Sequence, residues 1–164
     1  MLTQSCFACH GPQGASIAGP MPIIGGQESV YLASILRSYR SGERSSTVMG
    51  RLMRGYSDAE IEAIATYLGS LPYRPAAQPV DTAKAEAGRE PYNRVCKKCH
   101  TDNGKTSSEG DYPKLAGQWL PYLQETTEEI LAGKRKVDDK FSSSLGKLKR
   151  DEIDAVLHFF AAQK

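Results

Sequence analysis

Four cysteines constrain this chain more than any other feature, because all of them fall in two copies of one short motif. The motif is Cys-x-x-Cys-His, and its copies are Cys6-Phe-Ala-Cys9-His10 and Cys96-Lys-Lys-Cys99-His100. No cysteine remains outside the motifs to form a structural disulfide. The function of the motif therefore accounts for all four cysteines.

The motif is the attachment signature of c-type haem, in which two thioethers hold the porphyrin and the histidine ligates the iron. Zinc needs four ligands and usually places its second cysteine pair about 15–20 residues after the first, whereas 86 residues separate the pairs here. Thiol exchange of the thioredoxin kind needs a strand–helix–strand setting that the sequence lacks. We therefore predict two covalent haems, haem 1 on Cys6, Cys9 and His10, and haem 2 on Cys96, Cys99 and His100.

An internal repeat with an offset of 90 to 92 residues relates the two halves of the 164-residue chain. Beyond the motifs, the matching segments are Pro22–Gln27 with Pro113–Gln118, Gly42–Arg44 with Gly133–Arg135, and Glu60–Ile61 with Glu152–Ile153. Between the halves, the segment from Leu71 to Pro79 holds three prolines and is expected to be a semi-rigid linker. The repeat predicts two tandem domains, residues 1–78 and 79–164.

Helix signals dominate both halves. Apolar residues at helical spacing predict a helix over about residues 28–40, and Ser57-Asp-Ala-Glu60 is a capping box that begins a second. The C-terminal segment repeats this second pattern from Ile153 to Phe160. Ahead of the second motif, Asp81 can cap a helix that Pro91 should kink or shorten. No persuasive strand is visible, so the prediction is an all-α fold of two small units.

Composition excludes several classes of protein. With 40% hydrophobic and 24% charged residues, the chain has no apolar run near the roughly 18 residues that span a membrane. A formal net charge of +2 gives no support for nucleic-acid binding. No signal peptide is visible before Cys6. Because haem attachment of this kind resembles that of proteins matured outside the bacterial cytoplasm, we expect a leader to have been removed and the protein to be periplasmic.

A methionine thioether is the expected sixth ligand of haem 1, because it is soft, neutral and raises the reduction potential. The candidates after His10 are Met21, Met49 and Met53. Met21 is too close to His10, and Met53 is more simply explained by packing. Met49 lies between the two predicted helices, where a loop can turn back over the haem, so we predict that Met49 is the ligand.

Haem 2 differs, because no methionine follows Met53 in the sequence. The position that matches Met49 is Lys140 or Phe141, depending on the offset. Three states stay open: a five-coordinate iron under a Phe141 lid, ligation by a deprotonated lysine such as Lys140, or a weak water ligand. His158 is a further candidate but is expected to pack on the terminal helix. Five-coordinate or weakly ligated iron is the favoured interpretation, with a lower potential than a methionine ligand would give.

Other residues are candidates for the haem surroundings. Pro22 and Pro113 follow their histidines by 12 and 13 residues, where a backbone carbonyl can accept the second N–H of each imidazole. Trp119 and Tyr122 either line the pocket of haem 2 or simply pack. The run Lys134-Arg135-Lys136 is expected to be a solvated face.

The chain resembles the cytochrome subunit of flavocytochrome c sulfide dehydrogenases, which is built from two class I cytochrome c domains. The resemblance covers nearly the whole sequence and includes Ser46–Arg51, Gly55–Ser57, Tyr73–Ala76, Asp81–Ala83, Asp111–Tyr112 and Leu115–Gln124. It implies the family roles for both Cys-x-x-Cys-His motifs and for Met49. The second axial methionine of the family falls at Phe141 here, so that ligand does not carry over.

The resemblance implies an electron-transfer subunit that forms a heterodimer with a larger flavoprotein. Electrons from sulfide would leave the FAD of that partner, pass through the two haems and reach a soluble external acceptor. The chain has no Gly-x-Gly-x-x-Gly fingerprint, so FAD is expected on the partner. Two alternatives stay open: a free diheme carrier, and a haem enzyme or sensor that binds a small ligand at an open haem 2.

Overall fold

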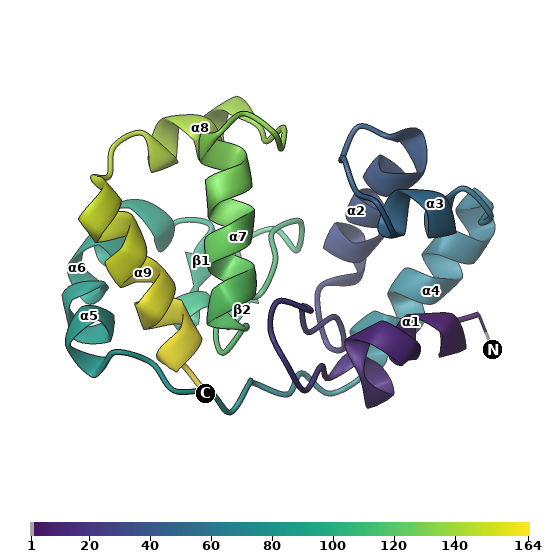
Figure 1. Ribbon diagram of the computed structural model, residues 1–164, viewed down its shortest axis with the longest axis horizontal. Helices are drawn as coiled ribbons and strands as arrows, with labels where there is room; N and C mark the ends of the chain where they lie inside the picture. Colours follow the sequence, from purple (N-terminus) through teal and green to yellow (C-terminus); the bar gives the residue numbers. More distant parts are fainter. Residues whose placement is uncertain (1) are drawn as a thin grey trace.

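The computed structural model describes residues 2–164, which form two mostly helical bodies side by side (Figure 1). The first body consists of α1 (Gln4–His10), η1 (Pro12–Gly14), α2 (Ser29–Ser41), α3 (Met49–Met53) and α4 (Asp58–Ser70). The second consists of α5 (Thr82–Ala87), α6 (Arg89–Pro91), η2 (Tyr92–Cys96), β1 (His100–Thr101), η3 (Asp102–Gly104), β2 (Thr106–Ser107), α7 (Leu120–Leu131), α8 (Asp139–Leu145) and α9 (Arg150–Ala162). The mostly helical prediction is confirmed, and β1 and β2 form only a short antiparallel pair.

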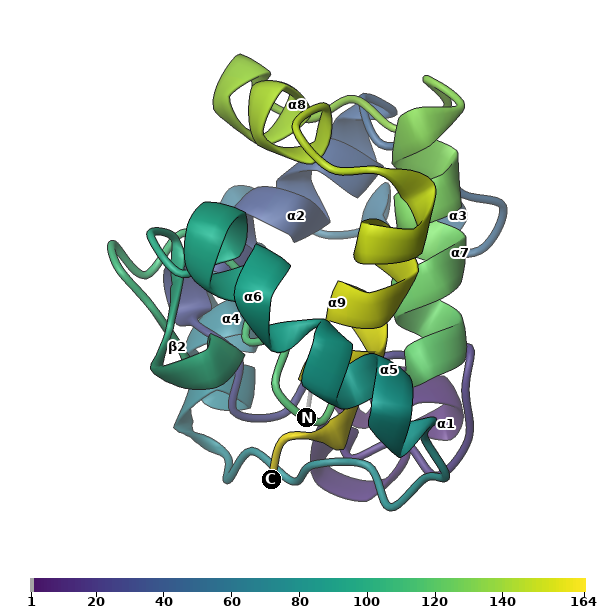
Figure 2. The ribbon, with the colours of Figure 1, turned by 90° about the vertical axis from the view of Figure 1, so that its left-hand side faces the viewer.

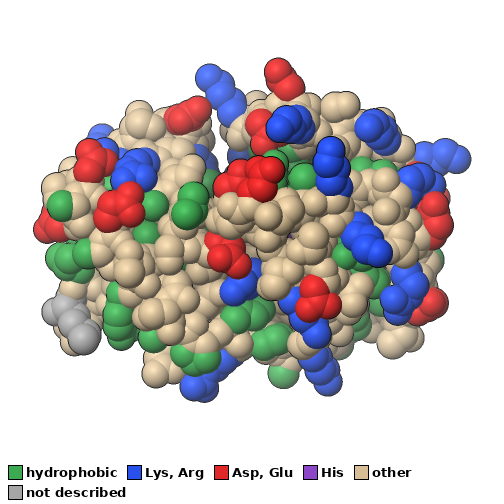
Figure 3. All heavy atoms as spheres, turned by 180° about the vertical axis from the view of Figure 1, so that it is seen from behind, with side chains coloured by type: hydrophobic (Ala, Val, Ile, Leu, Met, Phe, Trp, Pro, Cys, Tyr) green, Lys and Arg blue, Asp and Glu red, His purple; other side chains and the backbone are tan. Residues whose placement is uncertain are grey.

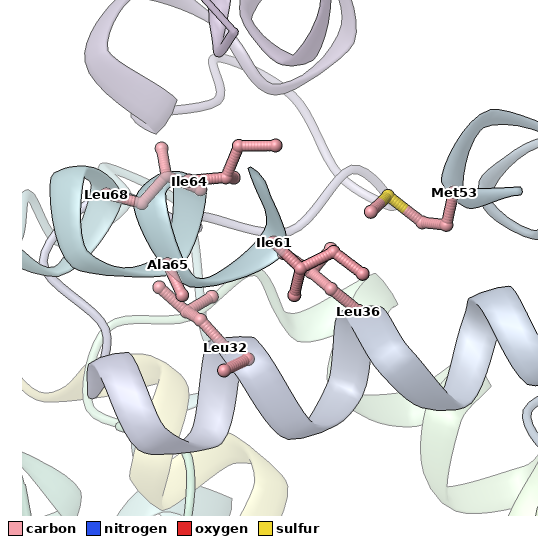
Figure 4. Close-up of a cluster of buried hydrophobic side chains, with 8 residues drawn as sticks. Leu32, Leu36, Met53, Ile61, Ile64, Ala65 and Leu68 are labelled. Carbon is pink, nitrogen blue, oxygen red and sulfur yellow. The ribbon is translucent and has the colours of Figure 1, made fainter. Parts of the chain in front are cut away.

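The first core lies between α2 and α4 (Figure 4). Helix α2 lies within one residue of its predicted range and ends at Gly42, whose φ of 81° is the left-handed conformation typical of a helix C-terminus. The predicted capping box begins α4, where Ser57 Oγ accepts from the Glu60 N–H and the Glu60 carboxylate accepts from the Ser57 N–H at 2.8 Å. The core consists of Leu32, Ala33, Leu36, Met53, Ile61, Ile64, Ala65 and Leu68.

The second core lies between α9, α7 and the ring of Tyr92, and α5 packs against α9 beside it (Figure 2). The predicted interruption before the second motif is present: α5 ends at Ala87, and after α6 the chain forms a π-helical turn, η2. Gly88 allows the close approach, since a Cβ there would lie 2.2 Å from the Ala155 carbonyl oxygen. The buried members are Tyr92, Leu123, Val156, Phe159, Phe160 and Ala161.

An irregular segment without helix or strand, residues 71–81, joins the two bodies along one edge (Figure 1). It is fixed to the second body, because Ala76 N–H donates to the Gly117 carbonyl at 2.7 Å. The Gln78 amide bonds in addition to the Gln118 carbonyl and the Leu120 N–H, both at 2.8 Å. The domain boundary after residue 78 falls within this segment and stays a prediction.

The surfaces of the two bodies differ. Of the 40 charged residues, 29 follow residue 78, and side chains of both signs are scattered over the face in Figure 3. The large hydrophobic side chains that are exposed among residues 2–164 all precede residue 53: Leu2, Ile17, Met21, Val30, Val48 and Leu52. None of the helices described is long and apolar enough to cross a membrane.

Candidate haem sites

The first motif occupies helix α1, which ends at His10 because Gly11 adopts a φ of 74°. Cys6 is half-buried, Cys9 is exposed, and His10 is buried with 7% of its surface exposed. The imidazole Nδ1 of His10 lies 2.8 Å from the carbonyl oxygen of Pro22. Because a carbonyl can only accept, Nδ1 is the protonated nitrogen.

The second motif leaves the π-helical turn at Cys96 and places His100 at the start of β1. His100 is 6% exposed, and its Nδ1 donates to the Pro113 carbonyl at 3.1 Å. Tyr92 holds this segment in place: its hydroxyl donates to the His100 carbonyl and accepts from the Asn103 N–H, both at 2.9 Å. The Nδ1 of each histidine is thus hydrogen-bonded to a proline carbonyl, and Pro22 and Pro113 are equivalent positions in the repeat.

Both imidazoles are neutral in this environment. Burial lowers the pKa of His10 and lowers the pKa of His100 to about 4, because it penalises the charged form. With Nδ1–H directed to a carbonyl, the lone pair of Nε2 is left for a metal. This is the tautomer that an iron-ligating histidine needs.

The cysteines have the properties of attachment sites rather than of a redox pair or a zinc site. None of the four is in a disulfide. Burial raises the pKa of Cys6 and raises that of Cys96 to about 11, whereas exchange-active cysteines have a lowered pKa. Among residues 2–164, no cluster of three or more His, Cys, Asp or Glu side chains is arranged to hold a metal ion.

The methionine candidates of haem 1 lie in three different environments. Met49 is half-buried and packs against the first core, but it is the first residue of helix α3 and not part of a loop. Met53, on the same helix, is 3% exposed and points toward the α2–α4 pair (Figure 4). Met21 is 38% exposed. Packing accounts for Met53, and the ligand role of Met49 stays a prediction.

On the side of haem 2, the candidates Lys140 and Phe141 belong to helix α8. Phe141 is half-buried and Lys140 is exposed; the Asp138 side chain caps the helix by accepting from the Phe141 N–H at 2.6 Å. Helix α8 contacts η2, which carries Cys96, so Phe141 lies on an element beside the motif. His158 lies elsewhere: it is 8% exposed, and its Nδ1 accepts the Asp81 N–H at 3.1 Å.

Two buried arginines test whether the surroundings suit haem. Arg44 is 9% exposed, and its near neighbours are phenols: its guanidinium lies 4.7 Å over the ring of Tyr39, whose pKa is raised by burial to about 12. Arg135 has an 11% exposed side chain, with the Glu129 carboxylate 3.7 Å away. Within residues 2–164, the Nε of neither arginine has a hydrogen-bond partner. Haem brings propionate carboxylates that complement such cations, so the residues present fit the group.

The position of Arg135 corrects one expectation, because the Lys134–Lys136 run is not wholly a solvated face. Trp119 and Tyr122 also have a role that the sequence did not reveal. Trp119 Nε1 donates to Ser16 Oγ at 2.7 Å, and Tyr122 Oη accepts from Arg44 Nη2 at 3.5 Å. Both side chains reach into the first body, so they form part of the contact between the domains.

Gln27 and Gln118 are the interface residues that sequence reasoning missed. Each is 3% exposed, and each bonds through its side-chain amide to the backbone of the opposite domain. A signal was available, because the two glutamines match in the repeat with an offset of 91. The repeat alone did not indicate that their partners lie across the interface.

The cytochrome c family model matches residues 1–72 and 85–164. This chain belongs to the cytochrome c family. It is 27% identical over 171 residues to cytochrome c4 of Azotobacter vinelandii, with 92% of this chain and 80% of the relative covered. The reduced recombinant cytochrome c4 of Pseudomonas stutzeri superimposes with a TM-score of 0.88 at 25% identity, over 99% of this chain and 95% of the other.

Two further relatives are named for sulfur-compound dehydrogenases. The thiosulfate dehydrogenase electron acceptor of Thiomonas intermedia is 32% identical over 144 residues, covering 82% of this chain and 66% of the relative. The cytochrome subunit of sulfide dehydrogenase of Chlorobaculum tepidum is 42% identical over 71 residues, covering 43% of this chain and 64% of the relative. The chain thus spans slightly less than two thirds of the length of both.

These findings confirm the prediction of two tandem cytochrome c domains. The chain is a diheme c-type cytochrome that carries electrons, with covalently bound haem c. Relatives with three different names match this chain, and the cytochrome subunit of sulfide dehydrogenase is one of them.

Proposed function

We propose that this chain is the electron-transfer subunit of a sulfide-oxidising flavocytochrome. It accepts electrons from an FAD-containing partner subunit and passes them through its two haems to a soluble acceptor. Electron transfer between the haems is supported by the hydrogen-bonded contact between two loops, Pro22–Gln27 and Pro113–Gln118. Each loop contains the proline carbonyl that accepts from a motif histidine. This contact brings the two haem sites to one interface.

In this proposal, Cys6 and Cys9 hold haem 1 and Cys96 and Cys99 hold haem 2, in domains 1–78 and 79–164. Each bound haem supplies a one-electron couple at its iron. The protein keeps His10 and His100 neutral by burial and fixes their rings through the Pro22 and Pro113 carbonyls. A ring held in one orientation reorganises little when the charge on the iron changes.

The flavoprotein partner is supported by two lines of argument. The cytochrome subunit of sulfide dehydrogenase of Chlorobaculum tepidum is 42% identical to this chain over 71 residues, which cover 43% of the chain. A dehydrogenase of this kind also needs a two-electron centre, and the sequence has no dinucleotide fingerprint to hold one. A heterodimer in the periplasm, where c-type haem is attached, is the corresponding assembly.

A free diheme carrier is the second candidate, and a specific observation favours it. The similarity to cytochrome c4 extends over 92% of the chain and 80% of that relative. The two candidates differ in one respect: a subunit co-purifies with a dehydrogenase, whereas a free carrier does not.

Purification from the native source tests the proposal. We expect the chain to co-elute with a flavin-containing subunit and to be reduced by sulfide only when that subunit is present. Thiosulfate serves as the second donor in the same assay. Elution without flavin, together with reduction by several unrelated donors, would establish a free carrier. Reduction by thiosulfate with no response to sulfide would place the chain with a thiosulfate dehydrogenase, and turnover by the isolated chain would identify haem 2 as an enzymatic centre.

A further inference from the structure

Gln27 and Gln118 make the same pair of hydrogen bonds in opposite directions across the domain interface. The Gln118 side chain accepts from the Ile23 N–H at 2.9 Å and donates to the Ile23 carbonyl at 3.0 Å. The Gln27 side chain accepts from the Lys114 N–H at 2.8 Å and donates to the Lys114 carbonyl at 3.0 Å. The contact is thus a two-fold arrangement in which each domain holds one residue of the other.

Ile23 and Lys114 each directly follow a proline whose carbonyl oxygen accepts a hydrogen bond from a motif histidine. The Ile23 N–H and the Pro22 carbonyl belong to one peptide group, and that carbonyl accepts from His10 Nδ1 at 2.8 Å. In the second domain, the Lys114 N–H and the Pro113 carbonyl form the equivalent group, which accepts from His100 Nδ1 at 3.1 Å. A continuous hydrogen-bond chain therefore runs from each glutamine through one peptide to the histidine of the opposite domain.

Such chains are cooperative. A peptide whose N–H is hydrogen-bonded is polarised, and its carbonyl becomes a stronger acceptor. A stronger acceptor at Nδ1 makes the imidazole a more basic ligand, because outer partners of a ligating histidine raise its basicity. A more basic ligand favours the ferric iron and lowers the reduction potential.

We infer that Gln118 is a positioning residue for haem 1 and Gln27 a positioning residue for haem 2, so that each domain sets the reduction potential of the haem in the other. This inference rests on the proposed roles of His10 and His100 as iron ligands. It explains why two glutamines, rather than apolar side chains, are buried at the centre of the contact.

The chain offers a matched control in Gln78. Its side chain also holds two backbone groups, the Gln118 carbonyl and the Leu120 N–H. Neither group belongs to a peptide that receives a histidine. Gln78→Met therefore removes bonds of the same number and type as Gln27→Met, without interrupting a chain to an imidazole. Gln118 makes one bond more, because its side-chain oxygen also accepts from the Trp119 N–H at 3.1 Å.

The experiment is a redox titration of the three holoprotein variants, with each potential assigned to its haem by the haem-methyl resonances in NMR spectra. We expect Gln118→Met to raise the potential of haem 1 and leave haem 2 unchanged. Gln27→Met should raise the potential of haem 2 alone, and Gln78→Met should change neither. Denaturant unfolding of the same samples should show that all three variants lose stability, with the smallest loss for Gln78→Met because Gln78 is only half-buried.

A shift of both haems by either variant, a shift in the glutamine's own domain, or no shift at all would overturn the inference. Should a methionine variant fail to fold, Gln118→Asn and Gln27→Asn retain a polar amide but shorten its reach, and the same crossed pattern is required of them. The ligand roles of His10 and His100, on which the inference rests, fail separately if the unmodified protein does not contain two histidine-ligated haems. The flavoprotein partner is tested by co-purification and does not affect the outcome of this titration.

Discussion

Replacing Tyr92 with phenylalanine isolates the contribution of one hydroxyl to the second haem site. This hydroxyl bridges two backbone groups, the His100 carbonyl and the Asn103 N–H, each at 2.9 Å. The ring itself is 1% exposed and lies 4.7 Å from the ring of Phe159 and 5.6 Å from that of Phe160. Tyr92→Phe keeps this packing and leaves both backbone groups without their partner.

A buried polar group left unpaired costs about 1–3 kcal/mol. The His100 carbonyl belongs to a residue that is 6% exposed and should incur much of that cost, whereas water can reach the half-buried Asn103 N–H more easily. We therefore expect a loss of about 2–3 kcal/mol in the free energy of unfolding. For a chain of this size the melting temperature should fall by about 4–12 °C if both domains unfold together.

Guanidinium unfolding of the holoprotein, followed by far-UV circular dichroism, measures this loss. Tyr56→Phe is the control, because the Tyr56 hydroxyl contacts only the exposed Ser5 Oγ, at 3.2 Å, and should change stability by less than about 0.5 kcal/mol. If Tyr92→Phe is as stable as Tyr56→Phe, the bridging hydroxyl does not stabilise the second motif and the reasoning is refuted.

Three further predictions concern the axial ligands and one surface ion pair. Met49→Ala should convert haem 1 to a high-spin form with a lower potential, whereas Met53→Leu should leave its spectrum unchanged; the reverse pattern would make Met53 the ligand. Phe141→Met should make haem 2 low-spin and raise its potential; a low-spin haem 2 in the unmodified ferric protein would contradict the open site. The Lys84 ammonium, 2.6 Å from Asp154, lowers the pKa of that carboxyl, so the pair stabilises the fold above the ordinary aspartate pKa and loses its effect as the pH falls through the lowered value. Asp154→Asn should therefore reduce the denaturation midpoint at pH 7 and not at pH 2, and an equal reduction at both would exclude the ion pair as the cause.

Local patterns were sufficient to predict α2, α4, α9 and the two-domain organisation, whereas the 12-residue helix α7 was not predicted. The apolar spacing around Leu32 and Leu36 predicted α2 to within one residue. A 13-residue helix with one buried face needs apolar residues at regular helical spacing, and this spacing is visible in the sequence. The Ser57–Glu60 capping box marked the start of α4 for a similar reason. The repeat, with its offset of 90 to 92 residues, indicated two domains because it pairs both haem motifs and the segments that follow them.

Short elements and contacts between distant residues could not be predicted in this way. Helix α3 has 5 residues and α8 has 7, which is too few for a periodic pattern to stand out. The Met49 region was therefore expected to be a loop. Gln118 bonds to a residue 95 positions away, and nothing in the local sequence around either residue specifies that pairing.

The proposed asymmetry between the haems would arise in the axial position and not in the scaffold. The prolines that accept from the histidines, the two interface glutamines and the two buried arginines are present in both domains. Met49, in contrast, is matched by Lys140 or Phe141. The bond from His10 to its carbonyl, at 2.8 Å, is shorter than that from His100, at 3.1 Å, and this difference alone would lower the potential of haem 1. Axial ligands set haem potentials over a range of roughly 0.8 V, so the proposed ligation by Met49 would outweigh the difference in the hydrogen bonds. With the proposed ligands, electrons that enter at haem 2 move downhill to haem 1, and the external acceptor is then reduced from the first domain.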